Sequence, residues 1–197
     1  MTLEEILRES ASRHKHLCPR QVLGARMALH GAELLGLDLP REDKRLLVIA
    51  ETDGCAVDGL IAATHCRVGG RTLRILDLGK VAATFTDTTR GHSIRVAPSP
   101  MARGLARTYA PQARNPWDAM LHAYQIMPTA ELLIAQDVQL DAPLEELLSH
   151  AGRKAICGVC GEEIINGREV LKDGRVLCRS CAGEGYYHLH ANYACEA

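Results

Sequence analysis

Two N-terminal segments show apolar residues at helical spacing. The first begins at Thr2–Glu5, a capping box in which a hydroxyl and a carboxylate satisfy free N–H groups at a helix start. The second begins at Pro19, which is favoured at a first helical position because its missing N–H would have no partner there. Its apolar positions continue to Gly36, a typical helix stop, so the pattern predicts a helix over residues 19–35.

Shorter apolar runs rich in β-branched residues follow and predict strands. These are residues 45–52, 72–78, 81–88, 93–97 and 132–140, with a hairpin turn expected at 68–71. Helical spacing or capping residues mark four further segments, at 57–64, 102–109, 117–127 and 143–149. Because helices and strands are mixed without strict alternation, the pattern favours an α+β fold over a doubly wound sheet.

The cysteines divide the chain. Three of the eight precede residue 67, and the other five follow residue 156. In a reducing compartment they do not indicate a disulfide scaffold. We therefore expect a mixed helix and sheet core over residues 1–150 and a second, small domain over residues 151–197.

Two C-x2-C pairs lie 17 residues apart in the C-terminal segment: Cys157, Cys160, Cys178 and Cys181. Four thiolates at this spacing suit tetrahedral Zn²⁺ and leave no open coordination position, so the predicted zinc is structural. Residues 164–170 and 175–177 are predicted to form a hairpin, and the second pair opens a short helical stretch. The arrangement resembles a treble-clef zinc finger, although each pair alone would also fit a redox dithiol. Three further potential ligands, which we assign to a tail, are His188, His190 and Cys195.

A second set of metal-ligating side chains precedes the helix predicted from Pro19. His14, His16 and Cys18 alternate there, so in an extended loop they point the same way. The helix N-terminus favours the thiolate form of Cys18, which metal binding and nucleophilic chemistry require. Cys55 follows a predicted strand and an Asp-Gly turn, a position where α/β-type folds place functional groups. His16, Cys18 and Cys55 are the candidate catalytic residues and ligands of a second metal ion, with a fourth position open for water or substrate.

Several short motifs occur in a characteristic order. Residues 14–20 read HKHLCPR, 55–58 CAVD, 64–66 THC and 77–80 DLGK. In these motifs the chain resembles the family named after the E subunit of formylmethanofuran dehydrogenase, whose leading motif is H-G-H-x-C-P-G. The resemblance covers residues 10–140, with Lys15 and Arg20 standing where the family motif has glycine.

The resemblance implies an α+β core that forms intertwined homodimers, with a C-terminal treble-clef zinc finger in some members. It also implies a redox or accessory role beside oxidoreductase subunits, in one-carbon or molybdopterin-linked metabolism. The namesake enzyme reduces CO2 to a formyl group on methanofuran at a molybdenum or tungsten pterin held by other subunits. Asp58 and Lys80 fall in the matching motifs, so we expect them near the core site.

Composition and charge leave a second function class open, in which a dimeric zinc-finger module or metal sensor contacts nucleic acid or protein. Four cations near the predicted zinc support it: Arg168, Lys172, Arg175 and Arg179. Acidic residues in the same segment cancel that charge, and the whole chain has a net charge of -1, so nucleic acid is not favoured. The acidic, amphipathic start and the absence of a long apolar run predict a cytoplasmic protein without a membrane span.

Overall fold

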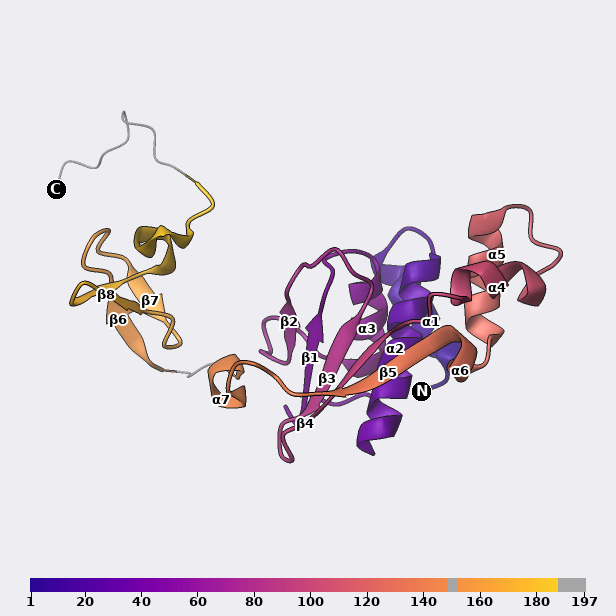
Figure 1. The fold of residues 1–197 in the computed structure, drawn as a ribbon, viewed down its shortest axis with the longest axis horizontal. Helices are drawn as coiled ribbons and strands as arrows, with labels where there is room; N and C mark the ends of the chain where they lie inside the picture. Colours follow the sequence, from indigo (N-terminus) through magenta and orange to yellow (C-terminus); the bar gives the residue numbers. More distant parts are fainter. Residues whose placement is uncertain (149–151, 188–197) are drawn as a thin grey trace. The chain divides into compact units, whose positions relative to one another are not determined.

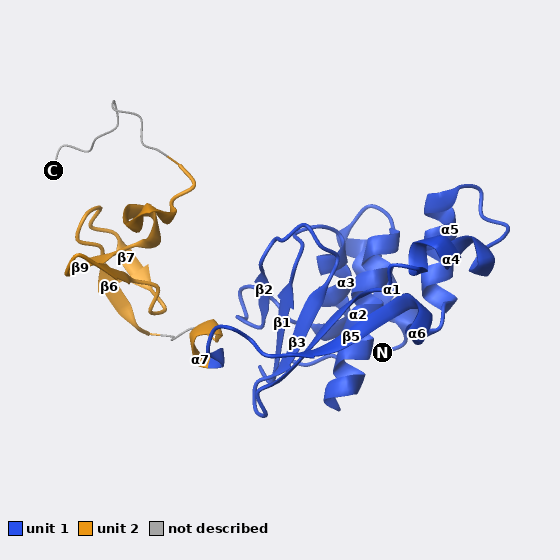
Figure 2. Cartoon of the chain, viewed as in Figure 1, with its two compact units in different colours: residues 1–144 blue, residues 145–197 orange. Residues whose placement is uncertain are grey.

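The computed structural model describes residues 1–148 and 152–187 and divides the chain into two compact units (Figure 2). Unit 1 comprises Met1–Leu144 and unit 2 Glu145–Ala197, so the division falls a few residues before the boundary expected at residue 150. The potential ligands His188, His190 and Cys195 lie outside the described residues.

A five-stranded mixed sheet with the order β2-β1-β3-β4-β5 forms the centre of unit 1 (Figure 1). Its strands are β1 (Leu46–Ala50), β2 (Leu73–Ile75), β3 (Ala83–Asp87), β4 (His92–Pro98) and β5 (Leu133–Val138). Strand β2 runs parallel to β1, and the other neighbours are antiparallel. This mixed architecture confirms the predicted α+β class.

Helices flank the sheet and connect its strands (Figure 1). They are α1 (Leu3–Arg13), α2 (Pro19–Leu35), α3 (Ala56–Thr64), α4 (Ala102–Tyr109), α5 (Pro116–Ile126) and α6 (Thr129–Leu132). A further short helix, α7 (Leu144–Leu147), begins at the last residue of unit 1. Helix α1 begins with the predicted capping box, and α2 has the predicted bounds, ending at Gly36 in the left-handed conformation. The turn at residues 68–71 joins α3 to β2 rather than closing a hairpin, because the preceding segment is helical.

The core of unit 1 lies between the sheet and the helices. Alternate strand residues such as Val48 and Phe85 face it, together with Val22 of α2 and Leu60 of α3. Phe85 packs directly on Gly31 of α2, where an added Cβ would lie 2.4 Å from the ring. A helix that carries glycine at this position can therefore approach the sheet closely.

Helices α2 and α3 also approach one another through glycine. A Cβ at Gly24 would lie 2.0 Å from the carbonyl oxygen of Ala56, and one at Gly59 would lie 2.1 Å from the carbonyl oxygen of Gln21. Both contacts lie in the first turns of the two helices or close to them. This close packing sets the N-termini of α2 and α3 side by side.

Unit 2 is built from two hairpins and a short helical turn. The first hairpin pairs β6 (Lys154–Ile156) with β7 (Glu163–Ile165), and the second pairs β8 (Val170–Lys172) with β9 (Arg175–Leu177). The prediction that residues 164–170 pair with residues 175–177 was therefore wrong for residues 164 and 165, because β7 pairs with the strand before the first cysteine pair. The turn at Asp173 and Gly174, both with positive φ, suits a tight hairpin. The helical turn is Ser180–Glu184.

No helix in the described ranges combines the length and the apolar content needed to cross a membrane.

Candidate functional site

The four cysteines of unit 2 converge on one point. Their ligand atoms all lie within 4.8 Å of one another, with the sulfurs of Cys160 and Cys178 3.9 Å apart. The first pair lies on the loop between β6 and β7, where Gly161 adopts positive φ and its N–H donates to the carbonyl of Cys157. The second pair lies between β9 and the helical turn. Four sulfurs around one centre can hold a metal ion and leave no open position.

Backbone N–H groups already favour negative charge in this cluster. Donation from the N–H groups of Cys160, Cys178 and Val159 lowers the pKa of the Cys157 thiol to about 6. The hydrogen bond with Cys178 and burial raise the pKa of the Cys181 thiol to about 12. N–H donation to ligand sulfurs is the usual support of a thiolate metal site, so the donor set fits a tetrahedral ion such as zinc.

Cys18 and Cys55 occupy equivalent places in unit 1, each as the residue before a helix. Cys18 precedes α2 and Cys55 precedes α3, whose N-termini the glycine contacts hold together. The backbone N–H of Cys18 donates to the side-chain oxygen of Gln21 over 2.8 Å. The amide nitrogen of the fully buried Gln21 donates in turn to the carbonyl and hydroxyl oxygens of Ser10 in α1. Gln21 thus fixes the loop that carries Cys18.

The two histidines of the leading motif lie beside these thiols. The Nε2 atom of His14 lies 3.7 Å from the sulfur of Cys55, and its Nδ1 atom lies 3.5 Å from a carboxylate oxygen of Asp58. The ring of His16 stands edge to face with that of His14, with centroids 5.3 Å apart. The structure therefore brings His14, His16, Cys18, Cys55 and Asp58 together.

The protonation of Cys18 differs from the sequence-based expectation. Burial raises the pKa of the Cys18 thiol, and the neighbouring Cys55 thiol raises it further. Hydrogen bonds from the backbone N–H groups of Gln21 and Arg20 act in the opposite direction but do not prevail. The prediction that the helix N-terminus favours the Cys18 thiolate was wrong, because desolvation outweighs hydrogen-bond donation at the helix end.

A pocket of about 500 Å³ opens beside the thiols. His16, Cys18 and Cys55 line one part of it, and α4 and α5 supply the facing part. The lining residues from these two helices are Arg103, Trp117, Met120 and Tyr124. The candidate residues identified in the sequence therefore share a cavity large enough for a small organic molecule.

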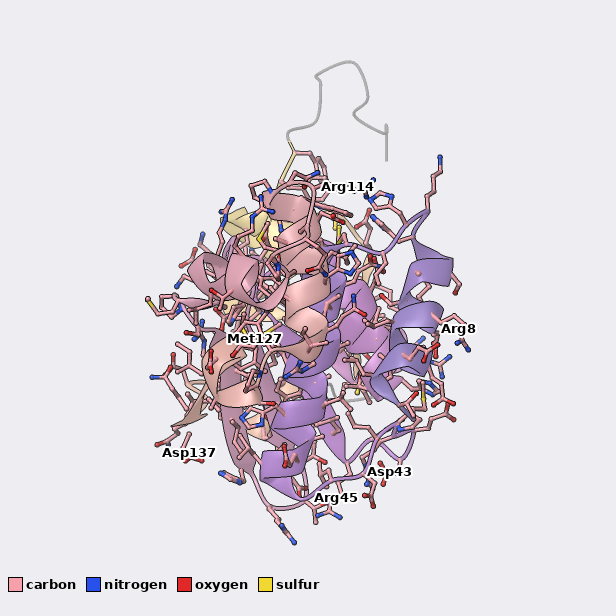
Figure 3. The ribbon with its side chains drawn as sticks, turned by 90° about the vertical axis from the view of Figure 1, so that its right-hand side faces the viewer. Arg8, Asp43, Arg45, Arg114, Met127 and Asp137 are labelled. Atoms are coloured by element: carbon pink, nitrogen blue, oxygen red, sulfur yellow. The ribbon has the colours of Figure 1, made fainter. Side chains whose placement is uncertain are left out.

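Arg26 of α2 holds the α5 wall of this pocket in place. Its guanidinium donates to the backbone oxygens of Tyr124 and Met127 at 2.9 Å and 2.8 Å, and to the hydroxyl of Thr129. Burial lowers the pKa of Arg26. Figure 3 looks onto α5 from the side where Met127 is labelled. The arginine thereby ties residues about a hundred positions apart in sequence.

The motif at residues 77–80 forms a turn outside the pocket. Asp77 accepts a hydrogen bond from the N–H of Gly79, and the N–H groups of Leu78 and Lys80 donate to the carbonyl of Glu51, so this motif forms a turn. The Lys80 side chain is exposed and does not line the pocket, whereas Val81 does.

The two sites differ in how tightly the ligand atoms cluster. In the described ranges, the four cysteines of unit 2 are the one group of three or more potential ligands whose ligand atoms all lie close to one another. His16, Cys18 and Cys55 line one pocket without forming such a cluster. The third N-terminal cysteine, Cys66, is buried in the core.

Comparison with known families identifies the family to which the chain belongs. Residues 13–134, more than half of the chain, match the family described as "FmdE, Molybdenum formylmethanofuran dehydrogenase operon". The chain belongs to the FmdE family. The matched segment includes both thiols, both histidines and the α4 and α5 walls of the pocket, so the whole core site lies within the FmdE region.

Two similar proteins extend the comparison. A protein of Archaeoglobus fulgidus named "Probable S-adenosyl-L-methionine-binding protein" is 34% identical over 93% of this chain and 54% of its own length. The chain thus spans about half the length of this relative. The crystal structure of a tungsten formylmethanofuran dehydrogenase FmdE-like protein from Syntrophus aciditrophicus matches with a TM-score of 0.62 and 21% identity, covering 95% of this chain and 96% of that one. This likeness shows that the two proteins share a fold.

Sequence reasoning missed the pocket residues of α4 and α5. Arg103, Trp117 and Tyr124 belong to segments that the sequence correctly predicts as helical, but nothing in their spacing connects them to Cys18. The single tryptophan of the chain, exposed on a predicted helix start, is the signal that could have drawn attention to this segment.

Proposed function

We propose that this FmdE protein is a metal-binding protein with two unlike sites, a structural zinc in unit 2 and a second ion in the pocket of unit 1. The observation that carries the second site is the convergence of Cys18, Cys55 and His14 beside an open cavity. Thiolate and imidazole are ligands that suit zinc and other late divalent metals. Because their ligand atoms are not clustered as closely as those of unit 2, binding of one ion requires these side chains to turn toward a common point.

The arrangement of His14 supports a ligand role for this side chain. A metal-binding histidine usually donates its other ring N–H to a carboxylate, which fixes the ring and strengthens the ligand nitrogen. In His14 a carboxylate oxygen of Asp58 lies 3.5 Å from Nδ1 and the sulfur of Cys55 lies 3.7 Å from Nε2, so the ring stands between a carboxylate and a thiol. His14 is therefore an alternative to His16 as the third ligand beside Cys18 and Cys55.

The open pocket suggests a chemical role for such an ion. An ion held by three protein ligands keeps a position for an exchangeable ligand and acts there as a Lewis acid. Cys18, Cys55 and one of the two histidines would hold the ion, in the pocket that Trp117 and Tyr124 also line. Within the FmdE family this fits the redox or accessory role in one-carbon metabolism that the motifs suggest.

The second-metal proposal is tested by metal analysis of anaerobically purified protein. We expect about two metal equivalents per chain in the wild type and about one in Cys55→Ser and in Cys18→Ser, since each removes a core ligand. Cys66→Ser is the matched control, because Cys66 is a buried cysteine outside the pocket, and it should keep both ions. One equivalent in all four proteins would show that the core binds no metal.

We also propose a homodimer. Strand β5 lies at the edge of the sheet, and its residues Ile134 to Asp137 are exposed, so its outer backbone groups are free to pair with a second chain. Sedimentation at micromolar concentration should show a dimer, and Ile134→Lys should shift it towards monomer by placing a charge on the edge. Val68→Lys, at another exposed apolar position, should sediment as the wild type does. A monomeric wild type would remove the proposal.

Two other ligands are less well supported. In unit 2, Lys154 pairs with Glu163 and Arg179 lies 3.9 Å from Glu184, so mixed charges oppose a nucleic-acid surface despite the exposed Tyr186. S-adenosylmethionine, suggested by the name of the A. fulgidus relative, carries a sulfonium cation. The arginines of the pocket would repel that cation, so we do not assign this ligand to the pocket.

A further inference from the structure

We propose that the pocket beside Cys18 binds a small organic anion in which a carboxylate or phosphate group is joined to a flat ring. The inference rests on the proposed function in one respect: the anion would bind beside the proposed core metal. The side chains that recognise the anion come from α2, α4 and α5 and include none of the proposed metal ligands.

The charge of the pocket points to an anion. Arg20, in the first turn of α2, and Arg103, in the first turn of α4, both line it, and no lining residue is acidic. Neither guanidinium has a hydrogen-bond or ion-pair partner among the described residues, unlike Arg26 and Arg107, which donate to backbone oxygens. Planar guanidinium groups bind carboxylate and phosphate oxygens with paired hydrogen bonds.

A largely buried phenol supplies a third donor. Tyr124 lines the pocket and is 4% exposed, yet its hydroxyl has no hydrogen-bond partner within the described ranges. Burial raises the pKa of Tyr124, so the phenol stays protonated and able to donate. Arg103 lies close enough to act on this pKa in the opposite direction. A hydroxyl without a protein partner remains available to a ligand, so an anionic oxygen could bind the phenol and Arg103 together.

The rest of the wall is suited to a flat apolar group. Trp117 of α5, Leu23 of α2 and Met120 of α5 line the same cavity. Trp117 is 43% exposed, so one part of the indole remains free for stacking. Aromatic and thioether side chains contact flat rings well, and the volume of about 500 Å³ accommodates a ring with its anionic substituent.

Trp117 also provides the test, because it is the only tryptophan of the chain. The full-length protein is titrated with nicotinate, phenyl phosphate, nicotinamide and S-adenosylmethionine while indole fluorescence is recorded. We expect a saturable change with nicotinate or phenyl phosphate, and the tighter of the two identifies the anionic group. Nicotinamide has the ring without the charge and should bind at least about tenfold more weakly.

Variants connect the signal to the pocket. Arg20→Gln and Arg103→Gln should each weaken binding of the preferred anion by about tenfold, and Tyr124→Phe by a smaller factor. Arg8→Gln is the charge-matched control, since Arg8 lies exposed on α1 and does not line the pocket; it should bind as the wild type does. Equal binding of nicotinamide, preference for S-adenosylmethionine, unchanged binding in both pocket arginine variants, or no saturable response to either anion up to about 10 mM would overturn the proposal.

Metal content measured on the same samples separates this inference from the metal proposal. Arg20→Gln should lose anion affinity and keep its metal, whereas Cys55→Ser should lose the core metal and still discriminate nicotinate from nicotinamide. Anion binding by a wild type that holds only one metal equivalent would refute the core metal and leave the anion pocket standing.

Discussion

Cys157→Ser is expected to unfold unit 2 and to remove its metal, while unit 1 remains folded. The expected loss is large because unit 2 has almost no core of its own. Its buried apolar residues in the described ranges are Cys157, Ile164 and Leu177, and Cys157 is itself one of the four cysteines proposed to bind the metal. A module of this size depends on its metal, and structural zinc in small finger domains contributes roughly 10–16 kcal/mol of apparent binding free energy.

Cys157 is the ligand whose loss should matter most. It is 1% exposed, it accepts a hydrogen bond from the N–H of Cys178 at 3.3 Å, and it connects the two cysteine pairs through that bond. The pKa of about 6 makes it the cysteine most ready to bind as thiolate near neutral pH. A serine hydroxyl binds zinc poorly and leaves three thiols that cannot close the site.

Metal analysis and amide hydrogen exchange test this prediction together. We expect the variant to lose one metal equivalent and the protection of β6 to β9, with the free energy of unfolding of unit 1 unchanged within about 0.5 kcal/mol. Val159→Ser is the control, since Val159 lies between the first two ligands but is exposed. Retention of full metal content in Cys157→Ser would show that this residue is not a ligand.

The sequence predicted elements well where local chemistry decides them. The capping box at Thr2, the proline at position 19 and the left-handed Gly36 each act within one helical turn; α1 begins where its signal implies, and α2 begins and ends where its signals imply. The C-x2-C pairs are similarly local, so the four-cysteine cluster followed from spacing alone. Such features can be predicted without knowing which segments pack against them.

Features that depend on contacts between distant segments were not predictable in this way. The parallel pairing of β1 with β2 and the pairing of β7 with β6 depend on which strand is available in three dimensions. The raised pKa of Cys18 depends on burial by elements far along the chain. The pocket needs Tyr124, which Arg26 fixes from a hundred positions away, and no local pattern encodes that contact.

Gly24→Ala should be among the most destabilising substitutions in unit 1, with a loss of about 3 kcal/mol in the free energy of unfolding. An added Cβ would lie 2.0 Å from the carbonyl oxygen of Ala56 and 3.1 Å from the backbone N of Leu60. Because the nearest atoms are backbone, no side-chain rotation relieves the overlap, and α2 and α3 must separate. The intrinsic gain of alanine over glycine in a helix, about 1 kcal/mol, is too small to compensate.

Separation of α2 from α3 should also disturb the core site, since Cys18 and Cys55 stand at the N-termini of these two helices. We therefore expect Gly24→Ala to lose the proposed core metal while unit 2 keeps its own. Gly104→Ala is the matched control, because Gly104 lies in α4 with nothing within 4 Å of an added Cβ. It should stabilise unit 1 by about 0.5–1 kcal/mol in urea unfolding. If Gly24→Ala is as stable as Gly104→Ala, glycine contacts do not hold the two helix N-termini together, and the convergence of the two thiols needs another cause.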